Sequence, residues 1–551
     1  MKSLKKNPLI LTLVCCCIVA FLIIGFKSEK KNDYINTPTD AITFSNQVPN
    51  GPEKNATKDE LYTFAWKQFA ALNWPAQTPN KYVERSTPSN HADSSFYSVE
   101  QKSSENMDLP LVVWSTFASK AEMFGPKYNT SKNKQLPAWK DIYTPSYSYS
   151  DQPTSLSSTP SSKYTLFNNL DENDEIGEAK VYGGSGKGSK TGGNQILYEA
   201  KVNQVEYDYI REFKLQNKDI VQHWSANTKS KLNKFGGTCK TEEASREAVI
   251  CFPCADTSSE GVIEIKAAWR ALTNKDKADR FYTKQVIVYE EVKGKIKYTN
   301  KIYALVGLHI IRKTKHHPTL IFTTFNHVDN INNGIYYENT LSDQGKHQYY
   351  KKDKTGHPKP YTDAINGVSN PQYTIPSGYQ SVKNQDEIHT IPTDLTAFNK
   401  KIQKQISGKN KKSVWQYYEL LGVQAIPVDY DNITIENIKT TYSSYYLAND
   451  VIETDYTLRK FTGTFGPRGV GILLETDNIT VASNPDLVTP IELPPKRYAM
   501  GGCMGCHGNA QQGGTDFSFL LGGGPLQKPA VLDYSITTSP EIEKYIKEIK
   551  N

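Results

Sequence analysis

Two cysteines and a histidine near the end of the chain have the types and spacing that chemistry requires. Residues 498–509 read Tyr-Ala-Met-Gly-Gly-Cys-Met-Gly-Cys-His-Gly-Asn, so Cys503, Cys506 and His507 stand in the order Cys-x-x-Cys-His. Thiols three positions apart can each add to one vinyl group on the same edge of a porphyrin, and the adjacent imidazole is then held beneath the iron. The motif predicts one covalent haem c with His507 as an axial ligand. A disulfide or half of a zinc site is the alternative interpretation.

The ligand on the other side of the iron is left open by the motif. Residues 508–551 contain neither Met nor His, so a sixth ligand has to come from upstream, or the position is open to a small molecule. Met500 and Met504 stand too near the attachment residues to reach the opposite side. Met107, Met123, a lysine or a histidine of the central region remain candidates. Because the tail is short for a complete small cytochrome domain, we expect the upstream domain to build the haem pocket.

The N-terminus has the pattern of an export segment. Three lysines in the first six residues precede an uncharged, mainly apolar stretch at 8–26, and further lysines follow it. This length fits a cleavable signal peptide or an uncleaved anchor whose positive flank stays in the cytoplasm. No small-x-small cleavage site stands out, so we expect a membrane-tethered, periplasmic or extracytoplasmic protein. Leu13 and Cys16 leave lipid attachment as a third possibility.

Three further cysteines lie in the middle of the chain, at Cys239, Cys251 and Cys254. In an oxidising compartment they supply one disulfide and leave one thiol, and all three pairings fit the spacing. A zinc site would need a fourth ligand. The Cys-Phe-Pro-Cys sequence does not follow the strand-to-helix pattern of a thioredoxin-like centre. We expect a structural disulfide.

Composition indicates a folded, water-facing body. The 551 residues, 37% of them apolar, are enough for a large packed core. The net charge of +7 is small for this length and basic residues are not massed on one segment, so we do not expect nucleic-acid binding. We divide the chain into a signal peptide or anchor at 1–30, a large domain at 31–490, and a haem attachment segment at 491–551 packed on that domain.

Strands with flanking helices must position the motif. A capping box at Thr57 and Glu60 predicts a helix with one apolar face that ends at Asn73-Trp74-Pro75. Segments rich in β-branched and aromatic residues predict strands at 195–198, 261–266, 285–292, 303–312 and 319–325. Helical patterns return around 413–421 and 440–457, and 141–162 and 183–193 are typical of loops. The fold class expected is α+β, with an antiparallel β-rich central domain, flanking helices and haem c attached near the C-terminus.

Several segments together resemble a family of large bacterial cytochrome c proteins. These are Phe69-Ala-Ala-Leu-Asn-Trp-Pro75, the stretches 261–269, 305–311 and 324–330, and the haem motif. The resemblance spans most of the chain after the N-terminal segment. It implies a haem protein and does not supply a reaction.

A second likeness concerns the order of three features: a Gly-x-Ile-x-x-Lys strand, a Val-x-x-His-x-x-x-Lys strand, and the C-terminal motif followed by Asp516-Phe-Ser-Phe519. This order looks like the β-sheet cytochromes that oxidise hydroxylamine, in which a lysine is cross-linked to the haem, and like β-type cytochromes c-prime. The likeness implies that the strands around Lys266 and His309 lie beside the haem. His309 is then a distal ligand or pocket residue, and His327 after the next strand is a second candidate. His316 and His317, in a basic turn, are expected to be exposed.

The function expected is extracytoplasmic electron transfer by a single covalent haem, with an unidentified redox protein as partner. The alternative is a haem enzyme or sensor with an open sixth position, acting on hydroxylamine, nitric oxide or peroxide. A scaffold that binds haem for stability is a third class. Whether the iron is low-spin or high-spin separates the first two.

Overall fold

The computed structural model has side chains and describes separate stretches of the chain. They are residues 41–78, 84–100, 109–124, 134–142, 181–183, 197–272, 276–292, 295–329, 336–337, 361–362, 369–370, 380–381, 391, 393–425, 447, 449, 452, 463–465, 491–493, 497–500 and 502–522. The chain divides into two units, Met1–Ala41 and Ile42–Asn551. The haem motif and the central strands therefore belong to the same unit.

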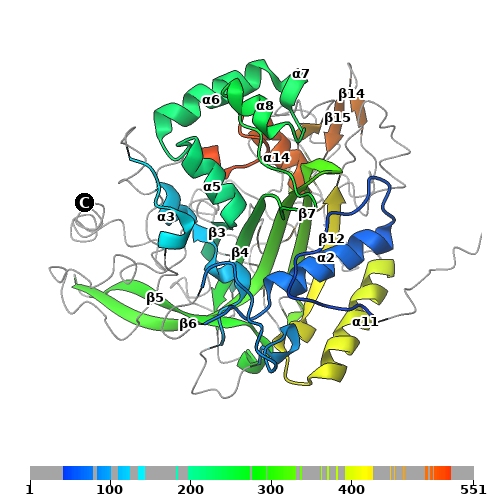
Figure 1. Cartoon of the computed structure of the whole chain (residues 1–551). Coiled ribbons are helices and arrows are strands. Elements are labelled where there is room, and N and C mark those ends of the chain that lie inside the picture. The colour runs from blue at the N-terminus through cyan, green and yellow to red at the C-terminus, as the bar shows by residue number, and fades with distance from the viewer. Residues whose placement is uncertain are drawn as a thin grey trace, which may run out of the picture. The chain divides into compact units, whose positions relative to one another are not determined.

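The centre of the second unit is an antiparallel sheet (Figure 1). Its order is β1-β3-β4-β6-β7-β12, with β5 paired to β6 beside this path. The bounds are β1 Ala118–Ser119, β3 Leu197–Val202, β4 Ile263–Ala271, β5 Thr283–Val292, β6 Lys295–Thr314, β7 His317–His327 and β12 Tyr418–Ala425. All five central segments predicted as strands contribute to this sheet. The α+β class with an antiparallel sheet is confirmed.

Cross-strand pairing assigns side chains to the two faces of the sheet. Lys266 pairs with His309, which pairs with Thr324 on its other side. Directly paired residues point to the same face, and so do residues two apart along one strand. Phe322 therefore shares the face of Thr324. We call this face, defined by Lys266, His309, Phe322 and Thr324, the His309 face.

The opposite face is covered by two helices, α2 Lys58–Leu72 and α11 Thr393–Lys409. The capping box predicted at the start of α2 is present, with Glu60 N–H donating to Thr57 and the Glu60 carboxylate accepting from Thr57 N–H. Phe69 lies 4.2 Å from Phe325, between ring centroids. Packing of this kind buries a continuous apolar core between the helices and the sheet.

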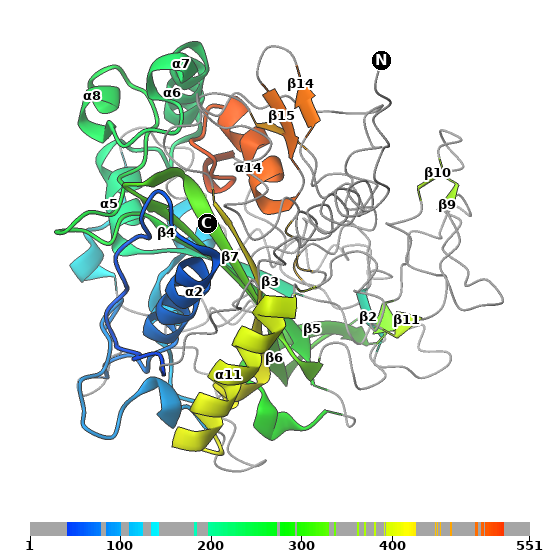
Figure 2. The ribbon, with the colours of Figure 1, turned by 90° about the vertical axis from the view of Figure 1, so that its right-hand side faces the viewer.

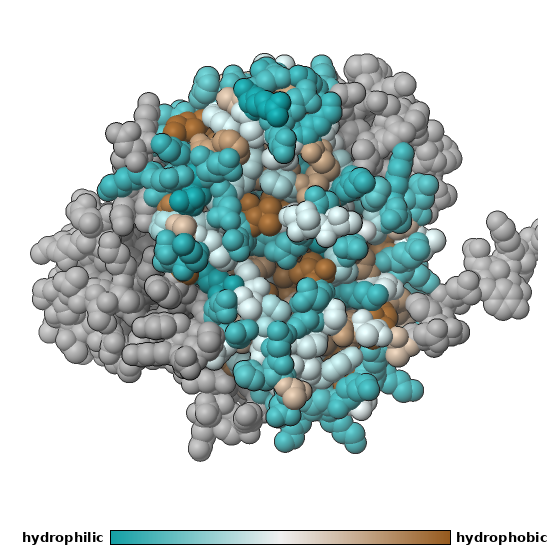
Figure 3. All heavy atoms as spheres, in the orientation of Figure 1, coloured by the Kyte–Doolittle hydropathy of each residue, from teal (hydrophilic) through white to brown (hydrophobic). Residues whose placement is uncertain are grey.

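The remaining elements lie around this core. The other α-helices are α3 Lys120–Phe124, α5 Gln204–Glu212, α6 Lys218–Ser230, α7 Leu232–Phe235, α8 Thr241–Arg246 and α14 Gly502–Gln512. Short 3-10 turns occupy η1 Phe96–Ser98, η2 Val113–Thr116, η3 Trp139–Asp141, η4 Ala278–Arg280, η7 Val414–Tyr417 and η11 Leu520–Gly522. Short strands outside the main sheet are β2 Val181–Gly183, β8 Tyr336–Tyr337, β9 Tyr361–Thr362, β10 Ser369–Asn370, β11 Gln380–Ser381, β13 Gly463–Phe465, β14 Ile491–Leu493 and β15 Arg497–Met500. The described surface drawn in Figure 3 is mainly hydrophilic, with scattered apolar patches.

One predicted helix is wrong. Residues 413–421 form the turn η7 followed by strand β12, which pairs with β7 along the edge of the sheet. Val414, Tyr418 and Leu421 stand at helical spacing, and so short a pattern does not separate a buried strand from a helix. The predicted helix at 440–457 and the predicted loops fall mostly outside the described residues.

Within the described stretches, no helix is both long enough and apolar enough to cross a bilayer. The N-terminal stretch 8–26, on which the anchor prediction rests, lies outside those stretches.

Candidate functional site

Helix α14 carries Cys503, Cys506 and His507 and lies on the His309 face, whereas α2 lies on the other side of β7 (Figure 2). The helix is held at its start. Cys503 N–H donates to Leu447 O at 2.9 Å, and the buried Cys503 thiol donates to the same carbonyl at 3.3 Å. Met504 N–H donates to Gln424 Oε1 at 2.8 Å. The first turn of a helix has backbone N–H groups without partners inside the helix, and these bonds satisfy two of them.

The His507 ring is oriented by one hydrogen bond and two aromatic rings. Its Nδ1–H donates to the carbonyl oxygen of Phe517 at 2.5 Å. The ring centroid lies 4.7 Å from that of Phe322 on β7 and 4.9 Å from that of Phe519. A backbone acceptor at Nδ1 selects the tautomer in which Nε2 carries the lone pair. This is how histidine ligands of metals are commonly oriented, and Nε2 is then the coordinating nitrogen.

The turn after α14 holds that carbonyl in an unusual backbone conformation. Asp516 and Phe517 both have positive φ, at 50° and 68°. Non-glycine residues rarely adopt this region, and each such residue costs on the order of 1–3 kcal/mol. At Gly514, with φ of 83°, a Cβ would lie 2.2 Å from Ser225 O, so only glycine fits. The backbone conformation of the turn is therefore imposed by tertiary contacts.

A buried ion pair anchors the turn to the sheet. Lys313 of β6 and Asp516 expose 0% and 1% of their side chains and form a direct salt bridge. The Asp516 carboxylate also accepts from Phe252 N–H at 2.6 Å. Lone buried charges are costly, so each partner depends on the other. The pair connects the residue preceding Phe517 to the strand that carries His309.

Asp516→Asn is expected to destabilise the fold by about 3–5 kcal/mol, because it leaves Lys313 charged and unpaired in the interior. Asparagine is nearly isosteric and tolerates positive φ, so the charge is the main change. The free energy of unfolding, from urea titration, measures the effect. Lys234→Ala, which removes the exposed pair with Glu247, should cost much less. Equal losses in the two variants would contradict a dominant role for the buried pair.

Lys266 and His309 are brought onto the same face as the His507 ring. His309 is a diagonal neighbour of Phe322, because Thr324 pairs with His309 and Phe322 pairs with the next residue on that face, Ile311. Diagonal neighbours are about 7–8 Å apart, and Phe322 contacts the His507 ring. His309 is 4% exposed. Lys266 is half-buried, with Nζ 5.2 Å from the centroid of the Tyr198 ring.

His327 is not brought to this site. It stands two residues after Phe325 on β7 and so shares the face that α2 covers. Its Nε2 donates to Arg280 O at 3.1 Å, its Nδ1 accepts from Asp329 N–H at 3.1 Å, and its ring stacks on Phe281. Both ring nitrogens are thus engaged in hydrogen bonds, on the face opposite to the one that holds the His507 ring. The sequence pattern placed it after a strand but did not say on which face.

The two turn histidines differ from the prediction in one respect. His316 is half-exposed and lies 3.6 Å from Glu53, between Nε2 and a carboxylate oxygen. His317 is 1% exposed, so the prediction that it is exposed is wrong. Burial lowers the pKa of His317 to about 4. His317, the first residue of β7, points its side chain into the interior. The basic residues around it in the sequence do not indicate this.

Stability should fall with acid because of these buried neutral histidines. Burial lowers the pKa of His327 to about 3, whereas the unfolded chain takes up this proton near pH 6.5. The contribution of His327 to the free energy of unfolding is fully present above pH 6.5. It is lost as the pH falls toward 3, at about 1.4 kcal/mol per pH unit. Urea unfolding at pH 7 and pH 5 should show a loss about 2 kcal/mol smaller in His327→Gln than in the wild type.

The exposed His91 supplies the control for that comparison, since His91→Gln should keep the wild-type loss between the two pH values. A His327→Gln protein that loses as much stability as the wild type would show that His327 takes up its proton in the folded state too.

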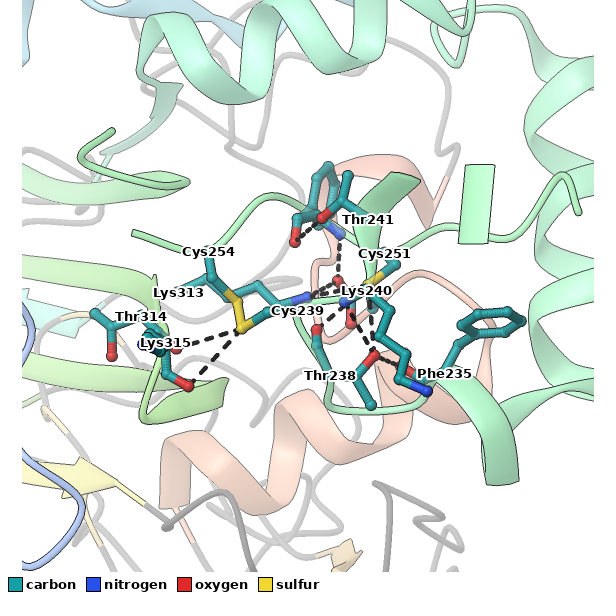
Figure 4. Close-up of a disulfide and its surroundings, with 12 residues drawn as sticks. Phe235, Thr238, Cys239, Lys240, Thr241, Cys251, Cys254, Lys313, Thr314 and Lys315 are labelled. Carbon is teal, nitrogen blue, oxygen red and sulfur yellow. Dashed lines mark hydrogen bonds and ion pairs between the residues drawn. A yellow bond between two sulfur atoms is a disulfide. The ribbon is translucent and has the colours of Figure 1, made fainter. Parts of the chain in front are cut away.

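The middle cysteines form one disulfide, between Cys239 and Cys254, and leave Cys251 as a buried thiol (Figure 4). This resolves the three pairings that the spacing allowed. The Cys251 thiol donates to Thr238 O at 3.3 Å, and Lys313 Nζ lies 3.9 Å from its sulfur. Burial raises the pKa of Cys251, so the thiol is held protonated.

The methionines named as sixth-ligand candidates are placed as follows. Met123 is 0% exposed in a separate apolar cluster with Phe124 and Trp139, which identifies it as a core residue. Met107 lies outside the described residues, and Met500 ends β15. Across the described ranges, no three His, Cys, Asp or Glu side chains gather as ligands for a metal ion. The iron would depend on the porphyrin for four of its ligands.

Three groups at the site are not predicted from the sequence. Gln424 and Phe322, which pair across β12 and β7, both contact α14, and the Phe517 carbonyl orients His507. Gln424 lies beyond the predicted helix at 413–421, in a stretch for which no strand is predicted, so its partner on β7 is not identifiable from the sequence. The segment Asp516-Phe-Ser-Phe519, which contains Phe517, is one of the features that resemble the β-sheet cytochromes, but that resemblance does not indicate a role for the Phe517 carbonyl.

Comparison with known proteins adds nothing to this description. No protein-family model, curated protein or solved structure matches the chain.

Proposed function

We propose that the chain is an exported c-type cytochrome that carries one haem on Cys503, Cys506 and His507 and transfers electrons outside the cytoplasm. The observation that carries the proposal is the His507 arrangement within a Cys-x-x-Cys-His motif. The bond from Nδ1 to the Phe517 carbonyl leaves Nε2 as the ligand nitrogen. Bound haem would supply one-electron chemistry.

The residues present fit such a group in three respects. Cys503 and His507 are four positions apart on α14, so they share one face of the helix. The rings of Phe322 and Phe519 flank the imidazole, and Phe519 is 44% exposed, which leaves apolar surface that a porphyrin would cover. The strained turn at Asp516 and Phe517 is held by the Lys313 ion pair rather than by local preference.

His309 is our candidate for the second axial ligand, because the register places it on the face that holds the His507 ring. Lys266, paired with His309, is a candidate haem contact from the neighbouring strand. The unidentified redox partner, the N-terminal membrane anchor and the extracytoplasmic location remain parts of the same proposal, and no role with nucleic acid is proposed.

A haem enzyme or sensor with an open sixth position is the second candidate. The half-buried Lys266 beside the buried His309 favours it, because polar groups on the distal side can orient a small polar molecule such as hydroxylamine, nitric oxide or peroxide. A spectrum of the reduced protein decides between the two. A low-spin form that ignores carbon monoxide supports the electron carrier, and a high-spin form that binds it supports the enzyme or sensor.

A further inference from the structure

Two buried carboxyl groups lie beside the turn that orients His507. Glu206 on α5 and Glu264 on β4 expose 0% and 6% of their surface. The Glu264 carboxyl hydrogen-bonds Ser518 and faces the Glu206 carboxyl. Neither Glu206 oxygen has a well-formed hydrogen bond to another described group. Buried carboxyl oxygens without partners are rare, and a shared proton is the simplest ligand that satisfies them.

The surroundings allow one negative charge on this pair and oppose two. Asn203 caps α5 by accepting from Glu206 N–H, so Glu206 lies at the helix N-terminus, where a negative charge is favoured. Burial raises the pKa of Glu264 to about 7. Burial, and next the charge of Glu264, raise the pKa of Glu206 well above its ordinary range. The pair therefore gains or loses a proton near neutral pH.

Other titratable groups of this region surround the pair. Asp516 faces both glutamates; burial raises the pKa of its carboxyl, and the ion pair with Lys313 opposes that rise. Burial raises the pKa of Cys251 and of Tyr209, which keeps both protonated. The groups that surround the pair are thus Asp516 from the turn, Lys313 from β6, Tyr209 from α5, and Cys251 before β4.

Three consecutive residues connect the pair to the proposed iron ligand. The Phe517 carbonyl accepts from His507 Nδ1–H. Its neighbours Asp516 and Ser518 contact Lys313 and Glu264 respectively. The carboxyl pair is therefore buried close to the redox centre, with little water to screen the interaction.

We propose that Glu206 and Glu264 together take up one proton when the haem is reduced and release it when the haem is oxidised. The inference rests on the proposed function. An external one-electron donor supplies the electron, which adds one negative charge at the iron. A proton from water then binds a carboxylate oxygen of the pair and compensates that charge. No covalent bond between heavy atoms forms or breaks.

The test is the midpoint potential of the haem-loaded full chain, measured by spectroelectrochemistry from about pH 5 to about pH 9. In the wild type the potential should rise as the pH falls, by up to about 59 mV per pH unit, the value of one proton per electron. The double variant Glu206→Gln with Glu264→Gln should lose most of this slope around pH 7. A reduced-minus-oxidised infrared spectrum should show the carbonyl band of a protonated carboxyl, absent from the double variant.

Glu260→Gln is the matched control, because Glu260 is a half-buried carboxyl whose pKa is raised by burial and which accepts a hydrogen bond from Asn203. It should keep the wild-type slope. A double variant with an unchanged slope and an unchanged infrared spectrum overturns the inference while the redox wave still supports the cytochrome. A wild type without covalent haem and without a wave overturns the cytochrome and the inference together.

Discussion

Replacing Cys503 and Cys506 by alanine is expected to abolish covalent haem attachment completely. Each thioether needs one thiol, and the alanine pair leaves only the coordinate bond from His507, which does not survive denaturation. The measurement is haem staining after denaturing electrophoresis, together with intact mass, for chain exported in a host that matures c-type cytochromes. The wild type should stain and carry the mass of one haem, and the variant should show neither.

Cys251→Ala is the matched control for that experiment. Cys251 is a buried thiol of the same unit, outside the disulfide and outside the motif. The variant should keep the full haem stain, with some loss of stability from the buried position. An unmodified wild-type chain under maturation conditions would remove the central proposal, and staining that depended on Cys251 would assign attachment to the wrong cysteines.

Replacing His309 by alanine is expected to convert a six-coordinate low-spin haem into a high-spin haem that binds carbon monoxide. The imidazole is the only histidine side chain among the described strands that the register places on the His309 face, beside Phe322 and hence near His507. Its loss leaves the position opposite His507 without a protein ligand. Visible absorption spectra of the oxidised and reduced forms, with and without carbon monoxide, measure the change.

His316→Ala controls for general effects of removing a histidine, since His316 is half-exposed in the turn before β7. It should keep the wild-type spectrum. An unchanged low-spin spectrum in His309→Ala would exclude His309 as the ligand. A wild type that is already high-spin and binds carbon monoxide would favour the enzyme or sensor.

Local signals identified the elements whose chemistry is contained within a few residues. The capping box at Thr57 and Glu60 marks the start of α2 because its hydrogen bonds close within one turn. The five central strands were recognised from β-branched and aromatic content. Helix α11 was missed although Leu395, Phe398, Ile402 and Ile406, all buried, repeat at helical spacing.

The helix predicted at 413–421 is wrong for a different reason. Val414, Tyr418 and Leu421 are buried and repeat at the spacing of a helix, so the sequence pattern favours a helix here. Only the pairing with β7 decided that this stretch is a strand.

The sequence by itself predicts covalent haem attachment at Cys503, Cys506 and His507, because their identities and spacing lie within five residues. It also proposed His309 as the distal candidate, with His327 on the next strand as a second one. Tertiary structure separated them: strand register puts His309 on the face of Phe322, which contacts His507, and puts His327 on the face that α2 covers. Alternation along a strand defines two faces, but which face receives a helix 180 residues away depends on packing across the whole core.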